Sequence, residues 1–179
     1  MIIYKKRVKE SGDVEHCWYK SSNIFYTKVD FSKSENKILN EVGITLNVPT
    51  VDVTVVFNRG AQYLYKGVEI HDYVSFINVL NREDSSSHGK AHNKFIKHYP
   101  AQKLKNMDMD ELQELKIKFL KQDEIERISK ISFDEKVDEC FNIMLNGNIT
   151  DEELIEKYGN SVVEEALKKE KVWFWEINE

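Results

Sequence analysis

One stretch, residues 47–68, constrains the fold more than any other part of the chain. Its first half, NVPTVDVTVVF (47–57), is rich in Val and Thr and alternates with a period of two, which is typical of a β-strand. The turn-forming residues Asn58-Arg59-Gly60 come next, and AQYLYKGV (61–68) has the character of a returning strand. The pattern predicts a β-hairpin, so the chain must contain an antiparallel sheet.

The rest of residues 1–100 is predicted to be β-rich with two short helices. We expect strands at 22–31 and 43–46 and helices at 71–84 and 91–99. The first helix is indicated by apolar residues spaced at i, i+3, i+4 and i+7. The two prolines of the chain, Pro49 and Pro100, are predicted to mark element boundaries.

Beyond Pro100 the sequence becomes helical and acidic. Helices are predicted at 109–131, 133–146, 151–158 and 161–169, and the chain closes with a strand at 172–177 or a hydrophobic anchor. Thr150 and Glu153 match a capping box that opens the third of these helices. The predicted fold class is α+β. A small antiparallel sheet with two packed helices forms a domain over 1–100, and a mostly helical acidic region occupies 101–179.

Composition and charge narrow the class of protein. With 179 residues, 41% hydrophobic and 32% charged, the chain is typical of a soluble globular protein. Residues 1–100 carry 14 Lys and Arg against 11 Asp and Glu, whereas residues 101–179 carry 12 against 20. An anionic partner is therefore expected at the first half.

Cysteine usage and hydropathy indicate the cellular compartment in which the protein is expected. Cys17 and Cys140 are far apart and form no metal-finger spacing, and a disulfide framework is not expected. The stretch MIIYKKRVKE has no apolar run of signal-peptide length, and no apolar run in the sequence is long enough to span a membrane. We expect a cytoplasmic protein, in a bacterial cell or a phage-infected host, and the pattern implies no cofactor.

A series of residues within 21–99 carries a resemblance to a known family. The series is Ser22-Asn23-Ile24, Val53-Thr54-Val55-Val56-Phe57, Gly60, Tyr63-Leu64-Tyr65, Gly67-Val68, Tyr73, Phe76, a serine-rich turn with Gly89, Asn93, Ile96 and Tyr99. In this series the chain resembles the KTSC domain, a small module named after the C-terminus of some lysyl-tRNA synthetases. The resemblance implies a sheet with two helices and the function commonly suggested for the family, RNA binding.

The chain departs from the KTSC pattern at three places. An insert separates Ser22-Asn23-Ile24 from the central strand, Asn81–Ser86 lengthen the loop between the two helices, and His92 replaces a usual aromatic residue. Residues 133–179 separately resemble the winged-helix-like tails of small phage proteins. That second resemblance implies a bacteriophage or a low-GC bacterium as the source.

Two tyrosines are the leading candidates for ligand binding. Residues i and i+2 of a strand share a face, so Tyr63 and Tyr65 point the same way. Aromatic rings on a sheet face can stack on bases, each contributing about 1–3 kcal/mol. The residues predicted to hold phosphates or bases beside them are Arg59, Lys66, Lys90, Asn93, Lys94 and Lys97. The alternative is that the rings pack under the helix at 71–84 and their hydroxyls form local hydrogen bonds.

Histidines offer a different chemistry. His88 and His92 are four residues apart, so a helix through both would place them on one face, where His98 could join them in metal binding or acid–base catalysis. The HExxH glutamate is absent, and solvated polar residues are the alternative interpretation. The run Ser85–Ser87 could form a backbone anion nest or a plain loop.

The C-terminus ends in an aromatic cluster, Trp173, Phe174 and Trp175. These residues are predicted to pack on the helix at 161–169 or to form a partner-binding edge.

Three functions follow from these patterns. The favoured one is a non-enzymatic binding protein whose KTSC-like half binds single-stranded RNA or a nucleotide-derived ligand. The alternative is a phage accessory protein that inhibits a host protein or a defence system, by direct binding or by sequestering its nucleotide signal. The third is a phosphodiesterase, metal-dependent or metal-independent, that uses the three histidines. A homodimer is compatible with each of them.

Overall fold

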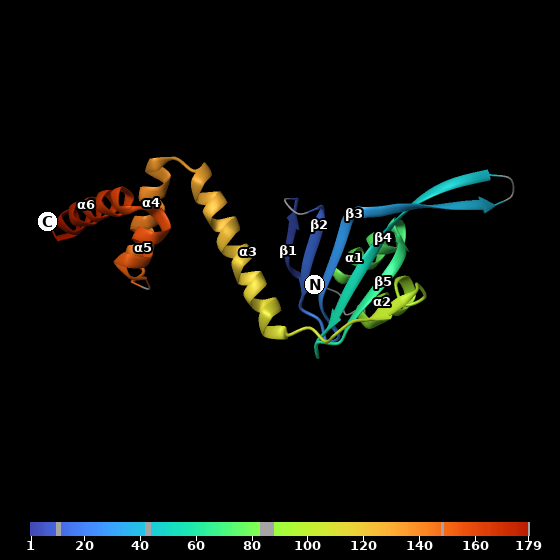
Figure 1. The fold of residues 1–179 in the computed structure, drawn as a ribbon. Helices are drawn as coiled ribbons and strands as arrows, with labels where there is room; N and C mark the ends of the chain where they lie inside the picture. Colours follow the sequence, from blue (N-terminus) through green and yellow to red (C-terminus); the bar gives the residue numbers. More distant parts are fainter. Residues whose placement is uncertain (10–11, 42–43, 83–87, 148, 179) are drawn as a thin grey trace. The chain divides into compact units, whose positions relative to one another are not determined.

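A computed structural model describes residues 1–9, 12–41, 44–82, 88–147 and 149–178 of the chain. The chain divides into two compact units, Met1–Lys116 and Ile117–Glu179. The division falls inside helix α3 (Met109–Lys130). The first unit contains an antiparallel sheet with helices and the second is helical, so the predicted α+β class is confirmed (Figure 1).

The first unit is built on a six-stranded antiparallel sheet in which the described strands follow one another in chain order. The strands are β1 (Ile2–Val8), β2 (Val14–Tyr19), β3 (Ile24–Glu41), β4 (Ile44–Phe57), β5 (Gln62–Glu69) and β6 (Ala101–Lys103). Helices α1 (Ile70–Leu80) and α2 (His88–Phe95) cover one face of this sheet (Figure 1). Neighbouring strands are mostly joined by short connections, which is the arrangement that antiparallel pairing allows.

The hydrophobic core lies between the sheet and the two helices. Alternate residues of β4, namely Val51, Val53 and Val55, point into it. From α1, Tyr73 and Phe76 pack against them, with Leu80 one turn further on. The predicted apolar stripe of this helix is therefore confirmed.

The opposite face of the sheet carries an aromatic cluster. Cys17 belongs to the helix-side core, so its neighbours His16 and Trp18 on β2 face the other way. The Trp18 ring lies 4.9 Å from the ring of Tyr26 on β3, and its indole N–H donates a 3.2 Å hydrogen bond to the carbonyl of Leu112 in α3. The first turns of α3 thus belong to the sheet unit.

The predicted hairpin of residues 47–68 is confirmed as β4 and β5, which pair through Val53↔Tyr65 and Val55↔Tyr63. The strands predicted at 22–31 and 43–46 belong to longer strands, β3 and β4. β3 and β4 pair from Ile24↔Phe57 out to Glu41↔Ile44, and their ends project beyond the sheet as a two-stranded arm (Figure 1). We define the arm as Glu35–Glu41 with Ile44–Thr50. Pro49 lies inside β4 and pairs with Asn36, so its prediction as an element boundary is wrong.

Other boundaries also differ from the predictions. Helix α1 ends at Leu80 rather than residue 84, and α2 begins at His88 and ends at Phe95 rather than covering 91–99. Pro100 does separate two elements, as predicted, but β6 follows it and pairs with β5. The sheet therefore includes residues beyond 100.

The second unit consists of the end of α3, α4 (Phe133–Leu145), α5 (Asp151–Tyr158) and α6 (Asn160–Asn178). The predicted capping box at Thr150 and Glu153 is present, and Ser132 with Glu135 forms another before α4. The strand predicted at 172–177 is wrong, because α6 continues as one helix to Asn178. Among the described residues, no helix is both long and apolar enough to cross a membrane.

Candidate nucleic-acid interface

The tyrosine pair of β5 is divided between the core and its edge. Both residues lie on the helix-facing side, as predicted, with their ring centroids 6.4 Å apart. Tyr65 is only 4% exposed, and its hydroxyl forms a 2.9 Å hydrogen bond with Nε2 of His92. Tyr63 is half-buried and packs edge-on against Phe57 at 6.0 Å. In this conformation the Tyr65 ring has no free face for a base, whereas Tyr63 lies at the rim of the core.

His92 is a core residue. It is 6% exposed and contacts the rings of Phe57 and Phe76 edge-on, as well as Tyr65. Burial lowers the pKa of His92, because a charged imidazolium loses its hydration there. This histidine therefore packs within an aromatic part of the core rather than on the surface.

The other two candidate histidines have different partners. Nε2 of His88 lies 3.2 Å from the N-terminal amine of Met1, and Nε2 of His98 lies 3.5 Å from a carboxylate oxygen of Asp72. Within the described residues, no group of three or more His, Cys, Asp or Glu side chains is placed to hold a metal ion. The predicted anion nest at Ser85–Ser87 lies outside the described residues.

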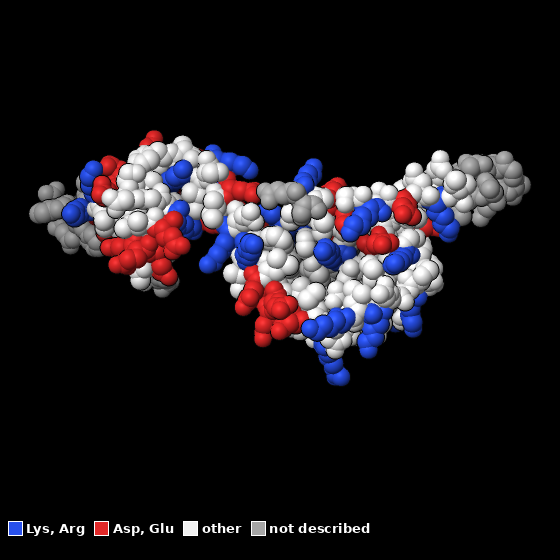
Figure 2. Space-filling model, in the orientation of Figure 1, with Lys and Arg blue, Asp and Glu red and all other residues white. Residues whose placement is uncertain are grey.

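A basic surface is formed by α2 and the chain that follows it. Residues 88–107 contain five lysines and three histidines but no Asp or Glu. All five lysines are exposed: Lys90, Lys94, Lys97, Lys103 and Lys105. Figure 2 shows Lys and Arg side chains along the part of the sheet unit that α2 occupies. We call these five residues the basic surface.

Strand pairing places the two halves of the basic surface beside each other. β6 pairs with β5 through Tyr63↔Lys103 and Tyr65↔Ala101, and α2 packs on Tyr65 through His92. Lys103 therefore lies opposite Tyr63 across the β5–β6 ladder, while α2, which carries Lys90 and Lys94, packs on the neighbouring Tyr65. Lys90, Lys94 and Lys97 are predicted from the sequence, but Lys103 and Lys105 are not, because their position depends on this pairing.

The remaining predicted contacts lie elsewhere. Arg59 is exposed in the β4–β5 turn, where Gly60 has φ +78° and a Cβ would approach the Met107 carbonyl oxygen to 2.5 Å. Asn93 is exposed on α2. Lys66 alternates with Tyr65 and so lies on the other face of the sheet, where it lines a polar pocket of about 690 Å³ with Lys33. The structure thus separates Lys66 from the basic surface.

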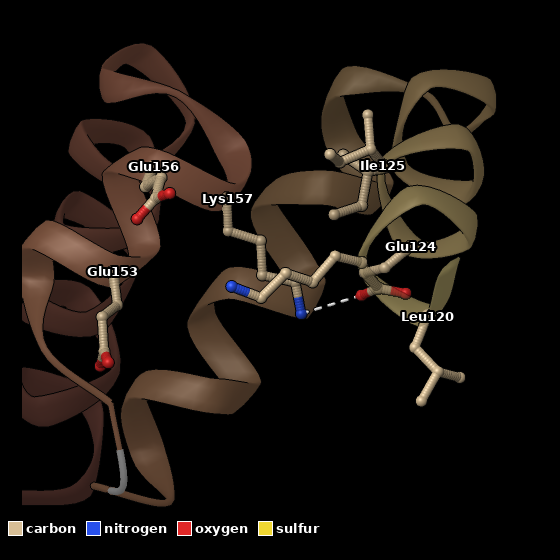
Figure 3. Close-up of a pocket in the computed structure, with 8 residues that line it drawn as sticks. Leu120, Glu124, Ile125, Glu153, Glu156 and Lys157 are labelled. Atoms are coloured by element: carbon tan, nitrogen blue, oxygen red, sulfur yellow. Dashed lines mark ion pairs between the residues drawn. The ribbon is translucent and has the colours of Figure 1, made fainter. Parts of the chain in front are cut away.

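A second candidate site lies in the helical unit, between α3 and α5 (Figure 3). It is a groove of about 450 Å³ whose apolar lining is Leu120, Ile125 and Ile128. Acidic and basic residues surround this lining: Glu124, Glu153, Glu156, Lys121 and Lys157. Lys157 Nζ and Glu124 Oε1 form a 2.9 Å ion pair across it, and Arg127 with Lys157 lowers the pKa of Glu124 to about 2.

The aromatic C-terminus contributes no defined site. Trp173, Phe174 and Trp175 belong to α6, and their side chains lie outside the described part of the chain. Their predicted partner contacts stay a prediction.

Comparisons with known proteins supply no family. No protein-family model matches the chain, and the search of curated proteins found no match. The KTSC and winged-helix resemblances therefore stay predictions.

The buried histidines make the stability of the sheet unit depend on pH. Burial, followed by the charge of Lys28, lowers the pKa of His16 to about 4, and burial also lowers that of His92. Between pH 6.5 and about 4 the unfolded chain binds protons that the folded chain does not. The contribution of the neutral histidines to the free energy of unfolding is therefore fully present above pH 6.5. Below pH 6.5 the free energy of unfolding falls, by at most about 1.4 kcal/mol per pH unit for each histidine.

Urea unfolding at pH 7, 6 and 5 measures this loss. Nδ1 of His16 and the Tyr26 hydroxyl are 2.6 Å apart, and asparagine can keep a polar atom near that position. The variant His16→Asn should therefore fold and show a shallower pH dependence than the wild type. An unchanged slope in His16→Asn would show that His16 does not titrate in this window.

Proposed function

We propose that the chain is a non-enzymatic, cytoplasmic binding protein whose sheet unit binds single-stranded RNA along the basic surface. One observation carries the proposal. A protein with a net charge of −5 presents five exposed lysines within a segment of twenty residues, 88–107, that contains no carboxylate. Such a surface attracts a polyanion, because each lysine that meets a phosphate releases condensed counterions.

The shape of the surface favours an extended strand over a compact ligand. The lysines are spread over a helix, an edge strand and the segment beyond it, so one mononucleotide would not meet all of them. Tyr63 supplies a half-buried ring opposite Lys103 in the β5–β6 pairing, and aromatic rings beside basic grooves stack on unpaired bases. The KTSC resemblance indicates RNA as the nucleic acid.

Fluorescence anisotropy with labelled single-stranded RNA tests the proposal. We expect binding at low salt and a logarithmic salt slope of about −0.7 for each phosphate contact. Single-stranded DNA and mononucleotides serve as competitors. If mononucleotides compete as well as RNA at equal phosphate concentration, the ligand is nucleotide-derived, and if the folded protein binds none of them at low salt, the proposal fails.

A second candidate function, inhibition of a host protein by direct contact, is favoured by the groove between α3 and α5. Its apolar lining with surrounding carboxylates would suit a partner segment that carries apolar and basic side chains. Ile125 is exposed in this groove, whereas Ile117 is exposed on the same helix without lining it. A partner retained from bacterial lysate should be lost with Ile125→Asp and kept with Ile117→Asp, and equal retention by both variants would exclude the groove.

A further inference from the structure

The arm extends past both of its neighbouring strands. β2 pairs with β3 only as far as Asp30, and β5 pairs with β4 only as far as Thr50. In the described ranges, no strand lies against the outer edge of either arm strand beyond those points. Ile38, on β3, is 63% exposed. An isolated two-stranded ribbon is marginally stable in water, so an arm of this length is expected to gain stability from additional strands.

The two edges of the arm are not equivalent. Pro49 has no N–H, and a proline is accommodated in a strand where that position faces an unpaired edge. The outer edge of β4 thus lacks a donor at Pro49 and carries its ring, which hinders the addition of another strand. Asn36 pairs with Pro49, and backbone groups of alternate residues in an antiparallel ladder point to the same edge. Asn36 and Ile38 therefore direct their N–H and C=O groups to the outer edge of β3. That edge contains no proline.

We propose that a second copy of this chain pairs with the outer edge of β3 along Glu35–Glu41, so that two arms form a four-stranded antiparallel sheet. When the β3 edges of two copies pair antiparallel, a two-fold axis relates the copies. The same edge then serves as donor and acceptor surface in both chains. This pairing satisfies the backbone groups along the outer β3 edge of each arm and covers exposed apolar surface such as Ile38.

The charge of the arm supports a protein partner over a nucleic acid. Its sequence, residues 35–50, contains only Glu35, Lys37 and Glu41 as charged residues. Lys37 Nζ already lies 3.2 Å from a carboxylate oxygen of Glu69. A surface with more acidic than basic groups does not attract phosphates, so the arm and the basic surface have different partners.

Light scattering after size-exclusion chromatography, over a dilution series of the full chain, tests the dimer. The wild type is expected to have twice the 21.1 kDa mass of one chain at high concentration. Ile38→Pro removes an outward N–H without removing a hydrogen bond of the arm, and it should halve the measured mass. Ile38→Lys, which adds a charge at the same exposed position, should shift dissociation to higher concentration.

Val74→Lys is the matched control, because Val74 is also exposed, at 48%, but lies on α1. It should dimerise like the wild type, and circular dichroism should show the same fold for all variants. A wild type that has the mass of one chain at every concentration overturns the proposal. So does a folded Ile38→Pro variant that dimerises as strongly as the wild type.

Discussion

Replacing Trp18 with alanine is expected to lower the free energy of unfolding of the sheet unit by about 3–5 kcal/mol. The Trp18 side chain is 0% exposed and packs among the rings of Tyr4, His16 and Tyr26. Alanine would leave a cavity there and would leave the Leu112 carbonyl, which accepts the indole N–H, without that donor. Because domains are stable by only about 5–15 kcal/mol, this one change removes a large share of the total.

Urea unfolding followed by circular dichroism measures the effect. Trp18→Phe is the matched control, since it keeps an aromatic ring and removes mainly the hydrogen bond to Leu112. It should cost about 1–3 kcal/mol, less than Trp18→Ala. A loss below about 1 kcal/mol for Trp18→Ala would mean that the face of the sheet opposite α1 and α2 is not packed as described.

Reversing two charges of the basic surface is expected to weaken RNA binding by at least about tenfold at moderate salt. Lys94 and Lys97 are exposed on and just beyond α2, so Lys94→Glu with Lys97→Glu should not disturb the core. The change removes up to two lysine–phosphate pairs and adds two repulsive charges. The logarithmic salt slope should become shallower by about 0.7 for each phosphate that the variant no longer neutralises.

The control for this pair lies in the acidic region. Lys118 and Lys130 are exposed on α3, and Lys118→Glu with Lys130→Glu lowers the net charge by the same amount. If net charge alone governed binding, both double variants would weaken it equally. The proposal predicts a large reduction in affinity only for Lys94→Glu with Lys97→Glu, and equal reductions would contradict a localised RNA surface.

The sequence predicts β4 and α1, whose residues are buried on one face. The alternation around Val53 and the apolar stripe of α1 are clear because each element has one face in the core and one face toward solvent. β2 has no such signature, since all six of its residues are buried. The C-terminal residues 172–177 are rich in β-forming aromatics, yet they continue α6, where the preceding helix overrides local preference.

The candidate site is predictable only where it depends on local sequence. Lys94 and Lys97 are recognisable as neighbours in one helical segment. The contribution of Lys103 depends on the pairing of β6 with β5, which no local pattern specifies. The burial of Tyr65 depends on how α2 packs, because its partner His92 reaches it from 27 residues further along the chain.

Lysine acetylation footprinting of the full chain, with and without saturating single-stranded RNA, would locate the RNA-binding surface residue by residue. We predict that RNA protects Lys90, Lys94, Lys97, Lys103 and Lys105, whereas Lys118 and Lys130 react at unchanged rates. Equal reactivity of the basic surface in the presence and absence of bound RNA, or protection confined to other lysines, would contradict the proposed function.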